Sequence, residues 1–166
     1  MALTWNDVVV GARAGALDKG VMTTAHIMRW SAAVENFHRI HYDHKFATEH
    51  DKLPGLLVNG SWKQHVLAQL AKDTLGIDGW LWKIRFRYQK MDLAGDSIRG
   101  HCDVVGKQEI DGDGFVVLKL VLTDQNDAVS TAGYAIGVLP LPGGAPVPYP
   151  FVPKPAYAAV EMPADD

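Results

Sequence analysis

The sequence contains little cysteine and no excess of basic residues, and each shortage excludes a class of protein. A single thiol, Cys102, cannot form an intramolecular disulfide or a thiolate-rich metal site, which favours a reducing, intracellular compartment. The net charge of −3 argues against a protein that binds nucleic-acid phosphates, because such proteins carry a basic excess. No apolar run approaches the roughly 18 residues that span a bilayer, and the first residues lack the features of a signal peptide. We therefore expect a cytoplasmic protein with no membrane or nucleic-acid partner.

Proline is scarce until Pro140 and then becomes frequent, in the stretch LPLPGGAPVPYPFVPKP. Hydrophobic periodicity ends at the same point, which favours an extended arm over a packed helix or strand. Upstream, the chain has the composition of one globular domain with a substantial core, since 48% of all residues are hydrophobic and 21% are charged. We predict a domain over residues 1–139 and a proline-rich tail over residues 140–166. Three aromatic side chains indicate that part of the tail packs against a protein surface: Tyr149, Phe151 and Tyr157.

Two helices are predicted in the first half of the chain. Thr23 and Thr24 are typical N-cap residues, and they predict a short helix that runs to about Ala33. A longer helix begins near Ser61 and stops at Gly76. Its apolar residues recur at helical spacing, which predicts a buried face made of Trp62, Val66, Leu67 and Leu70. Its polar residues are expected to face away: Lys63, Gln64, Gln69 and Lys72.

Strands are predicted mainly in the second half. Val8–Val10 is expected to form a short strand before a glycine-rich turn, and residues 36–60 are expected to be largely irregular. After Gly79 the hydrophobic period changes to two residues, which predicts a strand over 80–88. This strand would present its large apolar side chains on one face: Trp80, Trp82, Ile84, Phe86 and Tyr88. Three more strands are expected, at 97–110, 115–123 and 129–139. The order predicts an α+β fold in which a curled antiparallel sheet wraps around one long central helix.

The segment from Asn36 to Asp43, NFHRIHYD, is dense in side chains that carry chemistry. Histidine exchanges protons near neutral pH, so a histidine placed against a bound water is a natural general base. Two alternatives stay open: the segment is a surface loop whose polar groups make turns, or His38, His41 and His44 bind zinc. Asp43 is expected to cap the helical turn that follows it.

The start of the long helix at Gly60 is the second candidate feature. A helix N-terminus offers backbone N–H groups without intrahelical partners and a partial positive charge, which suits a developing oxyanion. Glycine also allows a substrate carbonyl to approach the backbone closely. Taken alone, the feature is a helix start like any other.

Taken together, the two features resemble the motif of the MaoC-like (R)-specific enoyl-CoA hydratase family, over roughly residues 5–139. In that motif an aspartate precedes the catalytic histidine by five positions, and a downstream glycine opens the long helix. Here Asn36, His41 and Gly60 occupy these positions, and Asn59 stands where the family often has histidine. The HRIHYD wording is closer to the branch that resembles mesaconyl-type CoA hydratases and 3-hydroxyacyl-thioester dehydratases, where asparagine replaces the aspartate. A later segment, FRYQKMDLAGDSIRG, resembles the family's aromatic–turn–Gly-Asp segment.

The resemblance implies a hot-dog fold and a hydratase or dehydratase that interconverts a 2-enoyl thioester and its 3-hydroxyacyl thioester. His41 would act on a water oriented by Asn36, and the Gly60 amide would stabilise the thioester oxygen. Four neighbours are expected to contact the substrate: His38, Arg39, Asn59 and Ser61. No metal and no redox cofactor is implied, because coenzyme A is part of the acyl-CoA substrate.

Assembly and two rival functions stay open. The resemblance implies a homo-oligomer, a dimer or larger, or else a subunit that shares its site with a second hot-dog chain. A hot-dog acyl-CoA thioesterase would want a carboxylate near the long helix, and Gln64 and Gln69 provide none. A basic group, made of Lys83, Arg85 and Arg87 with Arg99, would either meet coenzyme A phosphates or form a solvated outer sheet face.

Overall fold

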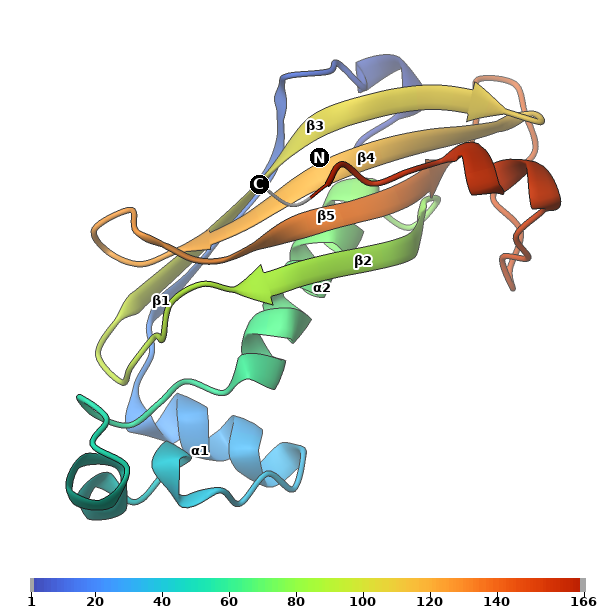
Figure 1. Cartoon of the computed structure of the whole chain (residues 1–166). Coiled ribbons are helices and arrows are strands. Elements are labelled where there is room, and N and C mark those ends of the chain that lie inside the picture. Colours follow the sequence, from blue (N-terminus) through green and yellow to red (C-terminus); the bar gives the residue numbers. More distant parts are fainter. Residues whose placement is uncertain (1, 165–166) are drawn as a thin grey trace.

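The structure is a computed structural model that describes residues 2–164. Five antiparallel strands form one sheet in the order β1-β3-β4-β5-β2, and helix α2 lies against one face of it (Figure 1). The strands are β1 (Arg13–Val21), β2 (Trp80–Tyr88), β3 (Ser97–Ile110), β4 (Asp113–Thr123) and β5 (Val129–Leu139). The predicted α+β architecture is therefore confirmed, and the four strands after the long helix lie close to their predicted ranges, with β4 beginning two residues earlier, at Asp113.

Helix α2 (Gly60–Leu75) is amphipathic and supplies the centre of the core. Its buried apolar residues pack against the inner faces of β3, β4 and β5: Val66, Leu67, Leu70, Ala71 and Leu75. Gly137 on β5 allows this close packing, because a Cβ atom there would lie 2.3 Å from a methyl carbon of Leu75. The helix ends at Gly76, whose φ of +74° is a backbone conformation that favours glycine. Among residues 2–164 no helix is long and apolar enough to cross a membrane.

The N-terminal strand does not lie where the sequence predicted it. Val8 and Val9 are in no regular element and Val10 begins a turn, and the strand is β1, which begins at Arg13 after Gly11. The glycine-rich stretch 11–20 was therefore wrongly interpreted as a turn. Gly15 lies in the strand because α2 passes close by: a Cβ atom at this position would lie 2.2 Å from Thr74 Oγ1. In a sequence, a glycine that allows close packing within a strand cannot be distinguished from a glycine that forms a turn.

The predicted single apolar face of β2 is also wrong, because a β-bulge interrupts the strand. Leu81 pairs with Gly137 and Lys83 pairs with Ile136, so Trp82 has no partner across the ladder. The extra residue reverses the alternation. Ile84 and Phe86 pack in the core beneath α2, whereas Trp80 and Trp82 lie on the opposite, outer face of the sheet.

The described part of the tail, residues 140–164, packs on this outer face of its own chain (Figure 1). Tyr157 and Val160 are almost fully buried there, in a cluster with residues of β4 and β5: Phe115, Val117, Ile136 and Val138. Trp82 contacts the ring of Tyr157 at a centroid distance of 6.0 Å. Burial of each large apolar side chain contributes about 1.5–3 kcal/mol, so these contacts hold the tail in place. Residue 1 of the predicted domain and residues 165–166 of the predicted tail lie outside the described residues.

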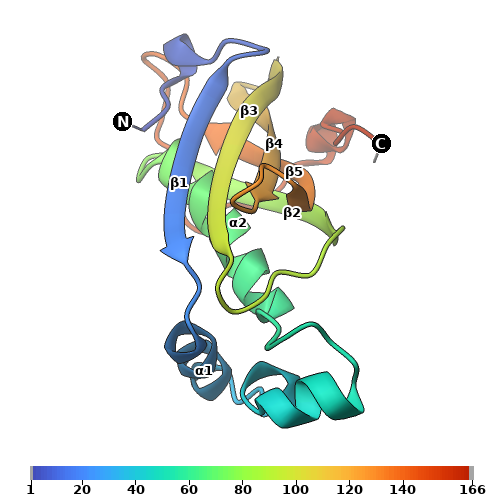
Figure 2. The same ribbon diagram turned by 90° about the vertical axis from the view of Figure 1, so that its left-hand side faces the viewer.

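Helix α1 (Thr24–Ala33) and the segment 34–59 lie outside the sheet, beyond the N-terminal end of α2, at the bottom of Figure 2. Thr23 caps α1 as predicted, since its hydroxyl accepts the His26 N–H at 3.3 Å. The segment 34–59 is irregular apart from a short 3-10 helix at Arg39–His41 and a π-helical turn at Phe46–His50. It carries the histidine-rich motif, and it returns the chain to Gly60.

Candidate active site

His41 is buried, and its ring is oriented by the backbone. Nδ1 lies 2.7 Å from the carbonyl oxygen of Leu57, and His41 is only 6% exposed. A carbonyl can only accept a hydrogen bond, so Nδ1 carries the proton and Nε2 keeps its lone pair. The Leu57 N–H donates in turn to the carbonyl of Ile40 at 3.0 Å, which ties the two segments together.

The surroundings of His41 keep its ring neutral. Burial lowers the pKa of His41 below its ordinary value of 6.5, and the neighbouring His38 lowers it further, while the bond to Leu57 opposes the shift. A neutral imidazole whose free nitrogen is Nε2 is the form that accepts a proton. The geometry therefore suits His41 to work as a general base near pH 7.

Asn36 lies beside the free nitrogen of His41. Its Nδ2 is 3.4 Å from His41 Nε2, and this contact suits the assigned tautomer because an amide N–H donates to a lone pair. The side-chain oxygen of Asn36 accepts the His38 backbone N–H at 3.4 Å, and the backbone N–H of Asn36 donates to the Ser31 carbonyl at 2.8 Å. Glu35, with φ of +53°, turns the chain out of α1 and into this position. The structure thus brings Asn36, His38 and His41 close together.

Two residues beside the helix start are engaged with α1. Asn59 is buried, and its Nδ2 donates to Ser31 Oγ at 3.0 Å. Ser61 Oγ accepts the indole N–H of Trp30 at 2.9 Å. Both side chains hold the start of α2 against α1, so their described contacts position Gly60.

Gly60 is the first residue of α2, so its N–H lies beyond the reach of intrahelical hydrogen bonding. Its carbonyl accepts a hydrogen bond from the hydroxyl of Tyr88 at 2.7 Å. A groove of about 500 Å³ opens beside it. The groove is lined by Leu57, Val58, Gly60, Lys63, Tyr88, Gln89, Lys90 and Met91. Leu57 connects the histidine-rich segment with the start of α2, because its carbonyl accepts the hydrogen bond from His41 and it lies three residues before Gly60.

Arg39 does not point at His41. Its guanidinium forms an ion pair with Asp43 at 2.7 Å and lies 4.3 Å from the centre of the Phe46 ring. Asp43 also accepts the Phe46 N–H at 3.0 Å, which is the predicted capping role. This bond and Arg39 lower the pKa of Asp43, so the carboxylate stays ionised. Within residues 2–164 no group of three or more His, Cys, Asp or Glu side chains is placed to hold a metal ion.

Lys63 was wrongly predicted to face away from the core. It is 3% exposed, and its ammonium donates to Asp92 Oδ2 and to the Lys90 carbonyl, both at 2.9 Å. The helical spacing itself indicates that Lys63 is buried. Lys63 precedes Val66, Leu67 and Leu70 by three, four and seven residues, so it lies on the same face of the helix. A lysine on an apolar helical face is expected to have a buried partner.

The loop between β2 and β3 carries that partner and also supports His41. Its backbone pairs with the segment before α2, through Val58 N–H to the Asp92 carbonyl at 2.9 Å and Ala94 N–H to the Leu56 carbonyl at 2.9 Å. These two bonds flank Leu57, the residue that orients His41. The predicted Gly95-Asp96 turn is present, and Gly95 has φ of +102°.

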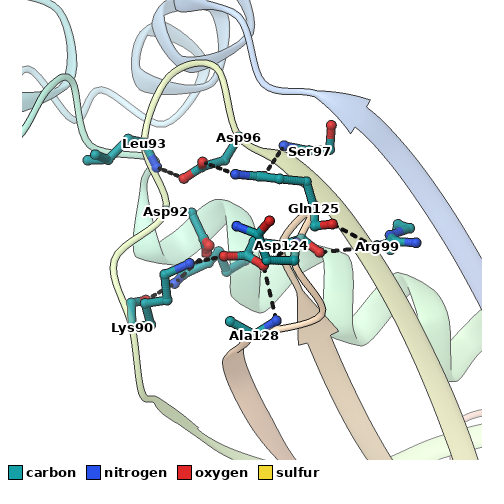
Figure 3. A network of polar contacts seen from close by, with 11 residues as sticks. Lys90, Asp92, Leu93, Asp96, Ser97, Arg99, Asp124, Gln125 and Ala128 are labelled. Atoms are coloured by element: carbon teal, nitrogen blue, oxygen red, sulfur yellow. Dashed lines mark hydrogen bonds and ion pairs between the residues drawn. The ribbon is translucent and has the colours of Figure 1, made fainter.

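A polar network holds this loop in place (Figure 3). Lys90 pairs with the buried Asp124 of the β4–β5 turn, and Asp96 accepts the Leu93 N–H at 2.8 Å and the Gln125 amide at 2.9 Å. Arg99 contacts the same turn, at the Asp124 carbonyl. This network, which sequence patterns did not predict, gives Arg99 a structural contact.

Comparison with known families gives a match that covers about half of the chain. Residues 13–94 match the family described as hydroxyacyl-thioester dehydratase type 2. These residues include the histidine-rich segment, α2 and the loop after β2. No curated protein sequence matches the chain.

Solved structures establish the fold. The (R)-hydratase from A. caviae involved in PHA biosynthesis is 22% identical, with a TM-score of 0.70, and the match covers 80% of this chain and 98% of that one. The ChsH1–ChsH2 complex from Mycobacterium tuberculosis is 17% identical (TM-score 0.68; 81% of this chain and 99% of that one). Rv0216 from M. tuberculosis, which has a double hot-dog fold, is 20% identical (TM-score 0.65), and this chain spans 53% of its length. The chain has the hot-dog fold.

Proposed function

We propose that the chain is a MaoC-like hydratase or dehydratase that interconverts a 2-enoyl thioester and its 3-hydroxyacyl thioester. The observation that carries the proposal is the pairing of His41 with Asn36: a buried, neutral imidazole presents Nε2 at 3.4 Å from an amide. The match of residues 13–94 to a family of hydroxyacyl-thioester dehydratases supports the same reaction.

In the hydration direction, His41 Nε2 removes a proton from a water that is hydrogen-bonded to Asn36. The water oxygen bonds to the β-carbon, the double-bond electrons move toward the thioester carbonyl, and the Gly60 N–H donates to its oxygen. His41 then returns the proton to the α-carbon, directly or through a relay. Dehydration follows the same steps in reverse, so no electron acceptor is needed.

The substrate in this proposal is an acyl-CoA in the cytoplasm, and the reaction needs no metal or redox cofactor. His38 borders the water site, because its backbone N–H and its ring both face the pair of Asn36 and His41. Arg39 would contact the substrate only after leaving Asp43. Asn59 and Ser61 support the site through Ser31 and Trp30.

Whether the chain works alone is decided by one experiment. We expect a purified homo-oligomer to hydrate trans-2-enoyl-CoA substrates, seen as loss of the conjugated thioester absorbance, with a rate that EDTA leaves unchanged. Light scattering in the same buffer gives the oligomeric state. Activity that arises only after a second hot-dog chain is added would favour the shared site that the sequence left open, an arrangement compatible with the ChsH1–ChsH2 neighbour. Absence of hydration in both forms would contradict the proposed reaction.

Asn36 is predicted to orient the attacking water. Asn36→Ala removes the amide beside Nε2, and we expect turnover to fall by about 10-fold, since loss of one positioned hydrogen bond costs up to about 1.5 kcal/mol and misorients the water. Asn36→Asp places a hydrogen-bonding carboxylate at the same site, and it is expected to retain activity. Steady-state kinetics of the two variants test the role, and equal rates in both variants and the wild type would contradict it.

A further inference from the structure

Tyr88 lies next to the proposed oxyanion donor, yet the mechanism above does not use it. Its hydroxyl donates to the Gly60 carbonyl at 2.7 Å, although the side chain is half-exposed at the end of β2. This bond joins the end of an edge strand to the first peptide of α2.

The ring of Tyr88 also covers the Cα atom of Gly60. A Cβ atom at residue 60 would lie 3.0 Å from Cζ, 3.1 Å from the hydroxyl oxygen and 3.3 Å from Cε2 of Tyr88. The φ of Gly60 is not positive, so its backbone does not by itself demand glycine. Residue 60 is therefore glycine for a steric reason: the ring of Tyr88 occupies the space that a side chain at residue 60 would need.

A buried lysine and a half-buried phenylalanine hold the ring in this position. The Lys63 ammonium lies 5.3 Å from the ring centre, a distance at which a cation attracts an aromatic face. Lys63 is itself held by Asp92 and by the Lys90 carbonyl. Phe86 packs against the ring from the same strand, with centroids 5.5 Å apart. Burial raises the pKa of Tyr88, so the hydroxyl keeps its proton and remains a donor.

We propose that Tyr88 is a positioning residue: its hydroxyl and ring hold Gly60 so that the Gly60 N–H faces the thioester oxygen in the adjacent groove. The inference rests on the proposed function. Tyr88 contacts the peptide that follows Gly60, and the ring forms a wall of the groove that Gly60 and Lys63 also line. It acts on the reaction through Gly60, so its loss lowers kcat more than it raises KM.

A double-mutant cycle separates this role from a merely structural one. Tyr88→Phe keeps the ring and is expected to lower kcat about 10-fold with KM within about twofold, as a small misplacement of a transition-state donor does. Gly60→Ala alone is expected to lower kcat about 100-fold. In the Tyr88→Ala background, the added effect of Gly60→Ala is expected to shrink to within about threefold, because no ring remains to clash. Tyr149→Phe, in an 86% exposed side chain of the tail, is the matched control and should match the wild type.

A readout without turnover keeps the two proposals distinguishable. In ¹⁵N-labelled protein, the Gly60 amide resonance is expected to differ between the wild type and Tyr88→Phe before any ligand is added. It is expected to shift when butyryl-CoA is added to the wild type, and to shift less in Tyr88→Phe. A wild type that hydrates no enoyl-CoA would contradict the proposed function, while the ligand-free resonance still tests Tyr88. Unchanged kcat in Tyr88→Phe, an unchanged Gly60→Ala effect in both backgrounds, or an unmoved resonance would overturn the positioning role.

Discussion

Replacing His41 with alanine is expected to lower the turnover of enoyl-thioester hydration by about 10²-fold or more, the scale at which general acid–base catalysis contributes. The expectation follows from geometry, because Nε2 is the ring nitrogen that keeps its lone pair, and so can accept a proton, once Nδ1 donates to Leu57. His41→Gln is the second variant, since its amide retains polar contacts but accepts no proton at neutral pH. Folded His41→Ala protein with near wild-type rates would exclude the assignment.

The pH dependence of the wild type provides an independent check of His41. The reaction needs the neutral ring, and the pKa of His41 lies below 6.5 because the ring is buried. Activity should therefore stay constant as pH falls through 7 and decline only below 6.5, when the ring becomes protonated. A decline that begins well above pH 7 would assign the essential base to another group.

Replacing Lys63 with methionine is expected to lower the free energy of unfolding by about 3–5 kcal/mol, the usual cost of leaving one member of a buried ion pair without its partner. Methionine fills the same space, so the loss comes from the charge. The side chain of Asp92 is fully buried, and its Oδ1 already has no hydrogen-bond partner among the described residues. Urea unfolding followed by circular dichroism measures the change.

Two controls accompany the Lys63 variant. Lys45, which is 80% exposed and 3.9 Å from Glu49, offers a matched surface pair, and Lys45→Met should change stability by less than about 0.5 kcal/mol. Adding Asp92→Leu to Lys63→Met removes the stranded carboxylate and is expected to recover much of the loss. Equal stability of Lys63→Met and the wild type would mean that the ion pair is not buried as described.

The sequence predicted the parts of the fold that follow a simple period. The alternation over 80–88 and the helical spacing over 61–75 each follow one repeating pattern, of period two or of one helical face, and the turn residues at 111–114 and 124–127 divide the strands that follow. It did not predict β1, because Gly15 is selected by the proximity of Thr74, which belongs to a distant part of the chain. Nor did it predict the bulge at Trp82, since both faces of β2 accept large apolar residues.

The candidate site was predictable in part for the same reason. Asn36, His38 and His41 are close in sequence, so their spacing alone brings them together. The supports of the site are remote. Leu57 lies 16 residues after His41. Tyr88 and Asp92 reach the site only where β2 and the following loop return to the start of α2. The position of Lys63 was visible in the helical spacing, but its partner lies 29 residues away. No local pattern connects such pairs.

The packing of the tail on the outer face has a consequence for association between molecules. All five strands end by Leu139, and Tyr157 and Val160 cover the outer face from beyond that point. A chain cleaved after Leu139 would keep every strand but would expose the apolar side chains of β4 and β5 that the tail covers. Contiguous exposed apolar patches favour association between molecules. The tail therefore protects the sheet from aggregation, and its loss would turn the outer face into a contact surface.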